Sequence, residues 1–394
     1  MAQLGQGGKR AAVCAALAAL AVPTLFSALD RAAARQPALA RLVPAPFQSQ
    51  SLVVESKRLI SRQHYAAAKP LAERAVHDGP IEPDSTALLG AARLGLGDEV
   101  GARRAFLVAG QLGWRSPTTQ LYWMDQALAV GDYPVAAMRM DALMRQQIGV
   151  ARTPDLLSLL EQVPDGREAL ADRLAARPVW LDIYASSSFD LPLQDALARS
   201  AVMNGLARRG LSIGCSGIGV LVGQLVRLGE VDRAFRTWSA HCRIARSGML
   251  TDAGFDALRA HQATSPFEWV IIGDSDVSVS LDQPQAGQSH IVVASSAAFP
   301  RKVIMQLVPL PPGSYRLAWR GNDSFGKPSG RIVAGLSCRP DTAEALPATL
   351  DNRTGLWSAA LAADSTCKAR WLAFSIRPGN DAVTLSDVSL VAAR

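Results

Sequence analysis

The sequence predicts a multidomain chain that is α-helical first and β-stranded afterwards: an N-terminal transmembrane or signal helix, an α-solenoid and a C-terminal antiparallel β-sandwich. Three observations carry this prediction. They are an uncharged apolar run near the N-terminus, turns that recur every 34 residues in a segment rich in Ala, Leu, Arg and Glu, and short alternating strands in the last third of the chain. We expect a membrane anchor or signal segment at 1–30, a linker at 31–50, helical repeats at 51–263 and the sandwich at 264–394.

The composition is that of folded domains. Hydrophobic residues make up 49% of the 394 residues and charged residues 19%, which is enough apolar material for sizeable cores and excludes a disordered chain. The formal charge of +7 is not concentrated in one segment, since residues 264–394 hold 12 basic and 11 acidic residues. No basic face large enough for a nucleic-acid backbone is expected, so nucleic acid is excluded as a partner.

The N-terminal apolar run has the length of a membrane span. Lys9 and Arg10 precede the uncharged residues 11–29, and a helix of that length extends about 28 Å, which just crosses a bilayer. The alternative is a cleaved signal peptide, because 19–21 (Ala-Leu-Ala) offers a small-x-small site. We expect a single-pass protein of a bacterial inner membrane with its bulk in the periplasm. The alternative is secretion to the periplasm after cleavage; arginines on the C-terminal side leave the orientation open on charge alone.

The helical segment contains a repeated turn. Gln63-His64-Tyr65, Gly97-Asp98-Glu99 and Gly131-Asp132-Tyr133 lie 34 residues apart, each followed by a small residue, and a fourth turn at Gly229 lies 98 residues beyond the third. A fixed period of this length is typical of stacked helix pairs.

The middle unit resembles a tetratricopeptide repeat. The resemblance rests on a small pair in the first helix, a glycine turn, small and aromatic residues along the second helix and a proline that opens the next unit: Leu89-Gly90, Gly97, Ala102, Phe106, Ala109 and Pro117. It implies a concave surface that binds a protein partner. The candidate groove residues are Tyr122, Trp123 and Arg139, with packing in the core as the alternative for the two aromatic residues.

Four of the five cysteines form two local pairs. Cys215 opens and Cys242 closes the last helix pair, and the ends of an antiparallel pair meet, which favours a disulfide between them. Cys338 and Cys367 form the second predicted disulfide, within the sandwich. Four separate buried thiols are the alternative. Cys14, inside the apolar run, is expected to be a free thiol. The sequence contains no C-x-x-C motif, so no metal site is expected from the cysteines.

The C-terminal segment predicts nine short strands. They are 269–272, 277–281, 290–295, 303–308, 314–320, 331–338, 357–361, 370–377 and 383–391. Residues 311–317 (Pro-Pro-Gly-Ser-Tyr-Arg-Leu) and 383–390 resemble strands of jelly-roll carbohydrate-binding modules. The resemblance implies polysaccharide as a ligand, and Trp357 is the candidate glycan contact because it follows a turn. Trp269, Trp319 and Trp371 stand in apolar alternation and are expected in the core.

The sequence offers no catalytic constellation. Gly273-Asp274-Ser275 resembles the first block of GDS-type esterases, but the last histidine is His290, so the C-terminal base that such enzymes need is missing. Glu161 and Asp165 read as a solvated helix end rather than as paired catalytic carboxylates. We therefore expect no catalytic residue, no metal and no cofactor; a polysaccharide hydrolase or lyase is the less favoured alternative.

These expectations combine into a non-enzymatic envelope scaffold. Its repeats would bind a protein partner and its sandwich a glycan or a second protein, in a role accessory to surface-polysaccharide production. The alternative is a protein-assembly factor that binds no glycan. Both interpretations rest on family resemblance and not on a set of reactive side chains.

Overall fold

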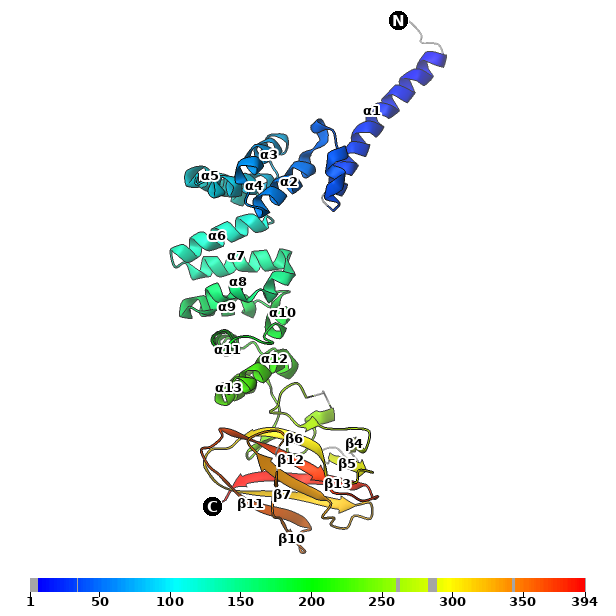
Figure 1. The fold of residues 1–394 in the computed structure, drawn as a ribbon, viewed down its shortest axis with the longest axis vertical. Helices are drawn as coiled ribbons and strands as arrows, with labels where there is room; N and C mark the ends of the chain where they lie inside the picture. Colours follow the sequence, from blue (N-terminus) through cyan, green and yellow to red (C-terminus); the bar gives the residue numbers. More distant parts are fainter. Residues whose placement is uncertain (1–5, 34, 260–262, 283–288, 342–343, 394) are drawn as a thin grey trace. The chain divides into compact units, whose positions relative to one another are not determined.

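The computed structural model describes residues 6–33, 35–259, 263–282, 289–341 and 344–393 (Figure 1). The chain forms two compact units, Met1–Val150 and Ala151–Arg394. Helices precede antiparallel sheets, and one apolar helix lies at the N-terminus, so the predicted fold class is confirmed.

The first unit begins with helix α1 (Gln6–Ala33). Within the described residues, its segment Ala11–Ala33 is the one helix that is long and apolar enough to cross a membrane, a test that a signal sequence near the N-terminus also passes. The expected linker at 31–50 is not simply extended: it contains the 3-10 helices η1 (Pro37–Leu42) and η2 (Ala45–Phe47).

Three helix pairs follow with a constant period (Figure 1). They are α2 (Ser49–Ser61) with α3 (Tyr65–Asp78), α4 (Pro83–Gly95) with α5 (Glu99–Leu112), and α6 (Pro117–Ala129) with α7 (Tyr133–Gln146). The first helices start at 49, 83 and 117 and the second helices at 65, 99 and 133, which is 34 residues in each step. The turn between partners also repeats, because the N–H of residues 64, 98 and 132 donates to the C=O five residues earlier.

Small side chains allow the paired helices to approach closely. Ala68, Ala102 and Ala136 occupy the same place in three second helices, and each is 0% exposed. A Cβ on Gly90 would lie 2.9 Å from the Phe106 ring, so a larger residue there would push the two helices apart. Gly97 ends α4 with a φ of +80°, a backbone conformation that glycine adopts without strain.

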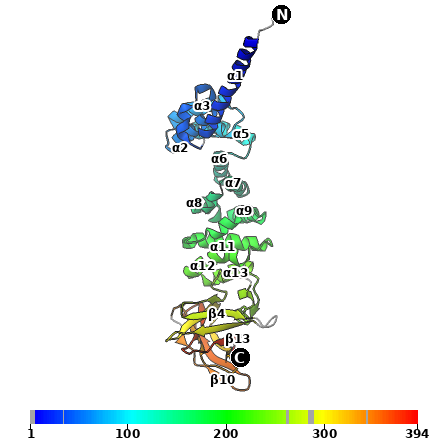
Figure 2. The same ribbon diagram turned by 90° about the vertical axis from the view of Figure 1, so that its right-hand side faces the viewer.

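The helices of the second unit are less regular (Figures 1 and 2). They are η3 (Ile148–Arg152), which spans the boundary between the units, α8 (Pro154–Glu161), α9 (Pro164–Ala175), α10 (Leu181–Ser186), α11 (Leu193–Arg208), α12 (Gly214–Arg227) and α13 (Val231–His241). Asp165 and Gly166 lie in the first turn of α9 and not in a turn between helices, so the 34-residue phase does not continue there. The repeated turn returns before α13, where the N–H of Glu230 donates to Leu225.

The β-sandwich consists of two antiparallel sheets. The six-stranded sheet has the order β10-β11-β7-β13-β5-β4 and the five-stranded sheet the order β3-β6-β12-β8-β9. The strands are β3 (Val270–Ile271), β4 (Val277–Asp282), β5 (His290–Ser295), β6 (Arg301–Pro309), β7 (Gly313–Asp323), β8 (Ile332–Ser337), β9 (Glu344–Ala345), β10 (Thr349–Asp351), β11 (Leu356–Ala363), β12 (Ala369–Ile376) and β13 (Val383–Ala392). Each of the nine predicted strands is present, and β9 and β10 are additional.

The connection between α13 and the sandwich is packed. It carries the short hairpin β1 (Arg246–Ser247) and β2 (Leu250–Thr251) and the 3-10 helix η4 (Ala257–Arg259). Leu250 and Phe255 are fully buried in the sandwich core although both precede residue 264, where the sequence predicts the sandwich to begin. Phe267 contacts Phe235 and Trp238 of α13, with ring centroids 5.1 and 5.8 Å apart.

Two disulfides lie in the second unit, and they are the predicted pairs. Cys215–Cys242 joins the start of α12 to the end of α13 with the Cα atoms 4.5 Å apart. Cys338–Cys367 joins the end of β8 to the residues before β12, with a Cα separation of 5.9 Å. Cys14 carries an exposed free thiol. Disulfides form in oxidising compartments.

Candidate binding sites

A hollow of about 350 Å³ lies between α4 and α6 in the first unit. The Tyr65 ring lies against the backbone of Gly95, where a Cβ would come within 2.4 Å of the ring. On the other side the Tyr122 ring stacks on Phe106, with centroids 3.9 Å apart and an interplanar angle of 11°. Leu94, which is 44% exposed, and Asp125 also line the hollow. Aromatic walls with one carboxylate suit a peptide that offers an apolar side chain beside a donor or a cation.

Tyr122 is therefore the predicted groove residue that reaches a hollow. Burial raises the pKa of its phenol, and the charges of Asp125 and Glu99 act in the same direction, so the hydroxyl stays protonated and available as a donor at neutral pH.

The two other predicted groove residues mainly support the helices. The indole Nε1 of Trp123 donates to the carbonyl of Phe106 at 3.2 Å. The Arg139 guanidinium lies 4.0 Å above the Trp114 ring and donates to the buried Gln120 at 3.2 Å. Burial lowers the pKa of Arg139. Arg139 is thus a half-buried packing residue and not a freely exposed one, which corrects the expectation that its side chain points into an open groove.

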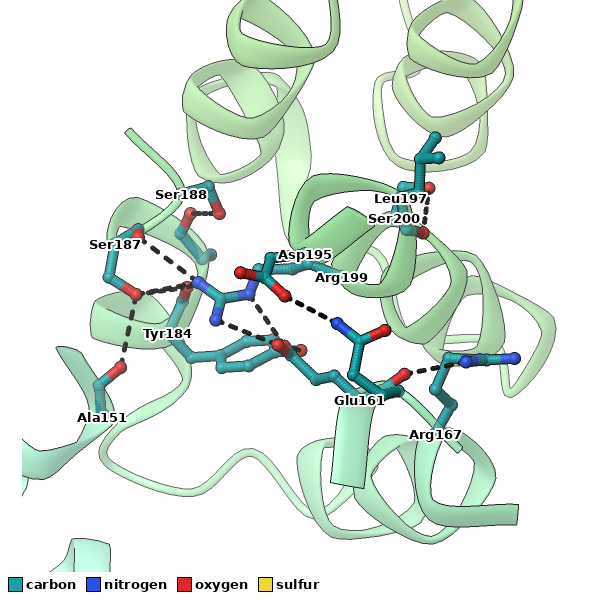
Figure 3. Close-up of polar contacts among 12 residues, drawn as sticks. Ala151, Glu161, Arg167, Tyr184, Ser187, Ser188, Asp195, Leu197, Arg199 and Ser200 are labelled. Atoms are coloured by element: carbon teal, nitrogen blue, oxygen red, sulfur yellow. Dashed lines mark hydrogen bonds and ion pairs between the residues drawn. The ribbon is translucent and has the colours of Figure 1, made fainter. Parts of the chain in front are cut away.

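Figure 3 shows a polar network around Glu161, and the side chains of Glu161, Tyr184 and Arg199 in it are buried. Glu161 is 1% exposed and lies between Arg199, also 1% exposed, and Tyr184. Arg199 Nε donates to Glu161 Oε1 at 2.8 Å, and the Tyr184 hydroxyl donates to the same oxygen at 2.5 Å. Arg199 also donates to the hydroxyl of Ser187 at 3.1 Å. The expectation of a solvated helix end at Glu161 is wrong.

A local signal for this network exists. Glu161 follows Leu157 by four residues, and Arg199 precedes Met203 by four, so both charges stand on the apolar faces of their helices. Burial, together with the Glu161 carboxylate, raises the pKa of Tyr184 well above its ordinary value. The Arg199 and Glu161 charges are paired with each other, and the guanidinium nitrogen atoms donate to neighbouring oxygen atoms. We therefore interpret the network as a structural contact that holds α8, α10 and α11 together.

The Cys215–Cys242 disulfide has a carboxylate beside it. The two sulfur atoms and a Glu268 carboxylate oxygen lie within 4.8 Å of one another. Among the described residues, these three form the group that could hold a metal ion by distance alone. Both sulfurs are bonded to each other in the structure. A disulfide does not offer the thiolates that zinc requires.

The four tryptophans of the sandwich divide into two groups. Trp269 and Trp319 are each 1% exposed and belong to the core, as expected. Trp357 pairs with Trp319 across β11 and β7 and packs against the core, and it points inward like Ala359 and Leu361 on the same strand. Its expected exposure as a glycan contact is therefore not what the structure shows. Trp371, expected in the core, is likewise half-buried.

The exposed aromatic rings of the sandwich are two phenylalanines. Phe325 is 85% and Phe299 74% exposed, in the loops after β7 and β5. Both loops are at one end of the sandwich, because Val383 at the start of β13 pairs with Asp323 on one side and Val293 on the other. Two strand spacings separate the ends of β7 and β5 by about 10 Å. The Asp323 carboxylate accepts from the N–H groups of residues 325 and 327, at 2.9 Å each, and so orders the turn that presents Phe325.

The residues of the esterase-like motif do not form a nucleophile–base pair. The Ser275 hydroxyl contacts Asp276 at 3.4 Å, just before β4. His290 lies opposite Asp282, at the other end of β4, with 3.4 Å between its Nε2 and the carboxylate. The register therefore keeps His290 several residues of strand length away from Ser275.

Comparisons with known proteins do not place the chain in a family. No protein-family model matches it, and no curated protein matches it. Among solved structures, a family 61 carbohydrate-binding module in complex with β-1,4-galactotriose is 15% identical, covers 38% of this chain and 100% of its own, and has a TM-score of 0.27. A candidate sugar-binding protein from Bacteroides thetaiotaomicron is 12% identical, covers 37% of this chain and 100% of its own, with a TM-score of 0.27.

A third similar structure is the enzymatically active domain of tailspike protein 4 of bacteriophage CBA120. It is 11% identical, covers 37% of this chain and 21% of its own, and has a TM-score of 0.26. Similarity at this level indicates neither a ligand nor an activity for this chain.

Proposed function

We propose that the protein is a membrane-tethered, non-catalytic binding protein whose helix pairs are tetratricopeptide repeats. The hollow lined by Tyr65, Leu94 and Tyr122 carries the proposal. It holds aromatic and aliphatic side chains that are partly open to solvent next to the carboxylate of Asp125. In our reading, an extended segment of a protein partner inserts an apolar side chain there, and a cationic or N–H group meets Asp125.

Photocrosslinking tests the hollow directly. A benzoylphenylalanine in place of Leu94 should give one defined covalent adduct in cells. The matched control is Leu107 on α5, which is 52% exposed but does not line the hollow, and the same replacement there should give none. Equal adducts from both positions, or none from Leu94, would reject the hollow as a partner site.

The anchor and the compartment belong to the same proposal. The membrane-length helix α1 lies at the start of the first unit, and the second unit holds two disulfides, which favours a chain fixed by 11–29 in the inner membrane with its bulk in the periplasm. A C-terminal alkaline phosphatase fusion should be active and should sediment with membranes. Activity in the soluble periplasmic fraction would indicate a cleaved signal, and activity confined to a cytoplasmic reporter would overturn the compartment.

A second candidate function is glycan binding by the sandwich. Phe325 and Phe299 present two exposed rings in loops that follow strands whose ends lie about 10 Å apart, and aromatic faces stack on sugar rings. This site replaces Trp357, which points inward. The full chain should retain a polysaccharide on a glycan array, and Phe325→Ala should lose that binding. Phe189→Ala, which removes a 63% exposed ring from the turn between α10 and α11, should keep it. If neither sandwich ring matters to any glycan, the protein is an assembly factor alone.

A further inference from the structure

The C-terminal end of α1 is hydrogen-bonded to α2, the first helix of the first helix pair. Asp30 is 4% exposed although it lies next to the apolar run. Its carboxylate accepts from the backbone N–H groups of Gln50 and Ser51 at 2.7 and 2.8 Å and from the Ser51 hydroxyl at 2.6 Å. Asp30 thus caps the first turn of α2 from 20 residues upstream. Phe26 of α1 stacks on Phe47 with centroids 5.5 Å apart, which strengthens the joint.

A hollow of about 580 Å³ begins at this joint. Ser51, which is bonded to Asp30, forms part of its wall together with Leu52 on the same helix. Leu71 on α3 adds a second aliphatic surface. The polar part of the lining comprises Gln48, Ser51, Glu55 and three arginines: Arg41 on η1, Arg58 on α2 and Arg74 on α3. The lining therefore combines aliphatic side chains with three arginines and one carboxylate.

The lining of this hollow carries a net positive charge, because three arginines stand against one glutamate. Residues 31–62 contain six basic residues and one acidic residue, Glu55. Glu55 accepts a hydrogen bond from Arg58, and this contact, helped by the charges of Arg58, Arg62 and Arg41, lowers its pKa. Within the described ranges, neither Arg41 nor Arg74 has an acidic partner, and both are exposed. At least two guanidinium groups are thus available to an anion.

We propose that this hollow binds the phosphate headgroup of an anionic phospholipid from the membrane that α1 enters. The inference rests on the proposed anchoring by α1. A guanidinium fork matches a phosphate better than an ammonium does, and Arg41 and Arg74 approach from two different elements. Leu52 and Leu71 offer the surface that the glycerol and the first acyl carbons need. The Asp30 joint keeps the hollow at the level where headgroups lie, and arginines beside a membrane helix are attracted to anionic lipid.

Native mass spectrometry of the full chain, released from dodecyl maltoside micelles, tests the proposal. With phosphatidylglycerol and phosphatidylcholine of identical acyl chains, one phosphatidylglycerol adduct should dominate. Arg41→Gln/Arg74→Gln should weaken that adduct by about tenfold or more, since two phosphate-facing charges are lost. The matched control is Arg103→Gln/Arg104→Gln, which removes two exposed arginines from α5 in the same unit and should leave the adduct unchanged.

The competing outcomes are distinct. Equal adducts with both lipids, or an unchanged adduct in the Arg41/Arg74 variant, would overturn the site. Displacement of the lipid by equimolar glycerol 3-phosphate would show that the hollow takes a free anion and not a membrane lipid. Cleavage of the N-terminal segment, which would remove the anchor, is detected in the same spectrum, because the cleaved protein has a lower mass.

Discussion

Replacing Arg199 with methionine should destabilise the second unit strongly. The substitution keeps an aliphatic stem but removes the guanidinium, which contacts Glu161 through Nε at 2.8 Å and through Nη2 at 3.3 Å. The Glu161 carboxylate then stays 1% exposed, and among the described residues the Tyr184 hydroxyl is its remaining side-chain partner. Breaking a buried ion pair on one side typically costs about 3–5 kcal/mol, because the other charge is left without compensation.

The chain offers a matched control on the same helix. Arg208 pairs with Glu168 at 2.8 Å, the same distance as the Arg199–Glu161 pair, but the two side chains are 62% and 53% exposed. An exposed pair contributes about 0–1 kcal/mol. For a unit of this size, each kcal/mol lowers the melting temperature by about 2–4 °C. Arg199→Met should therefore lower it by roughly 6–20 °C and Arg208→Met by less than about 4 °C.

Circular dichroism melts of the full chain in detergent measure both variants, and hydrogen exchange of amides in α10 and α11 locates the effect. Removing both charges in Glu161→Leu/Arg199→Met should recover part of the loss, since no unpaired charge remains. Equal melting temperatures for Arg199→Met and Arg208→Met would refute the reasoning, because burial is the property that distinguishes the two pairs.

Three further predictions concern packing, crosslinks and pH. Ala102→Leu should overpack α4 against α5 and lower the free energy of unfolding by about 1–3 kcal/mol. Ala67→Leu, on an exposed face of α3, should leave the melting temperature unchanged. An unchanged melting temperature for Ala102→Leu would contradict the 34-residue phasing. The two disulfides close loops of 27 and 29 residues, and reduction of each should lower the free energy of unfolding by roughly 3–4 kcal/mol. Non-reducing peptide mapping should recover these two local pairs and no crosslink between them. His241 is 1% exposed, and burial lowers its pKa, so its contribution to stability is present above about pH 6.5 and is lost as the pH falls toward the folded value. His241→Gln should flatten the fall in melting temperature below that pH, and an unchanged slope would argue against this residue as the cause.

The elements that the sequence predicted well are those with local causes. Helix starts follow from proline and turn residues at a fixed period, and Gly97 and Gly131 mark two of the turns directly. The nine strands follow from alternation between Pro- and Gly-containing turns. The Cys215–Cys242 disulfide follows from helix-pair geometry, since the two ends of an antiparallel pair meet.

The features that the sequence did not predict depend on contacts between distant segments. The Glu161–Arg199 pair joins residues 38 apart, and no local rule says which buried charge finds which partner. Trp357 follows a turn, which suggested exposure, but its pairing with Trp319 fixes its inward direction. The hollow beside Asp30 needed the position of α1 against α2, which the apolar run alone does not give.

The two disulfides also limit how far the chain can be stretched. A bond between Cys215 and Cys242 removes 27 residues from the extensible contour, about 95 Å at full extension, and Cys338–Cys367 removes 29 residues, about 100 Å. Under a pulling force applied between the membrane and the C-terminus, the oxidised chain would lengthen in fewer and shorter steps than the reduced chain. In the proposed membrane-tethered arrangement, the oxidation state of the compartment would thus set the maximum length of the chain and the distance over which a bound partner could be held.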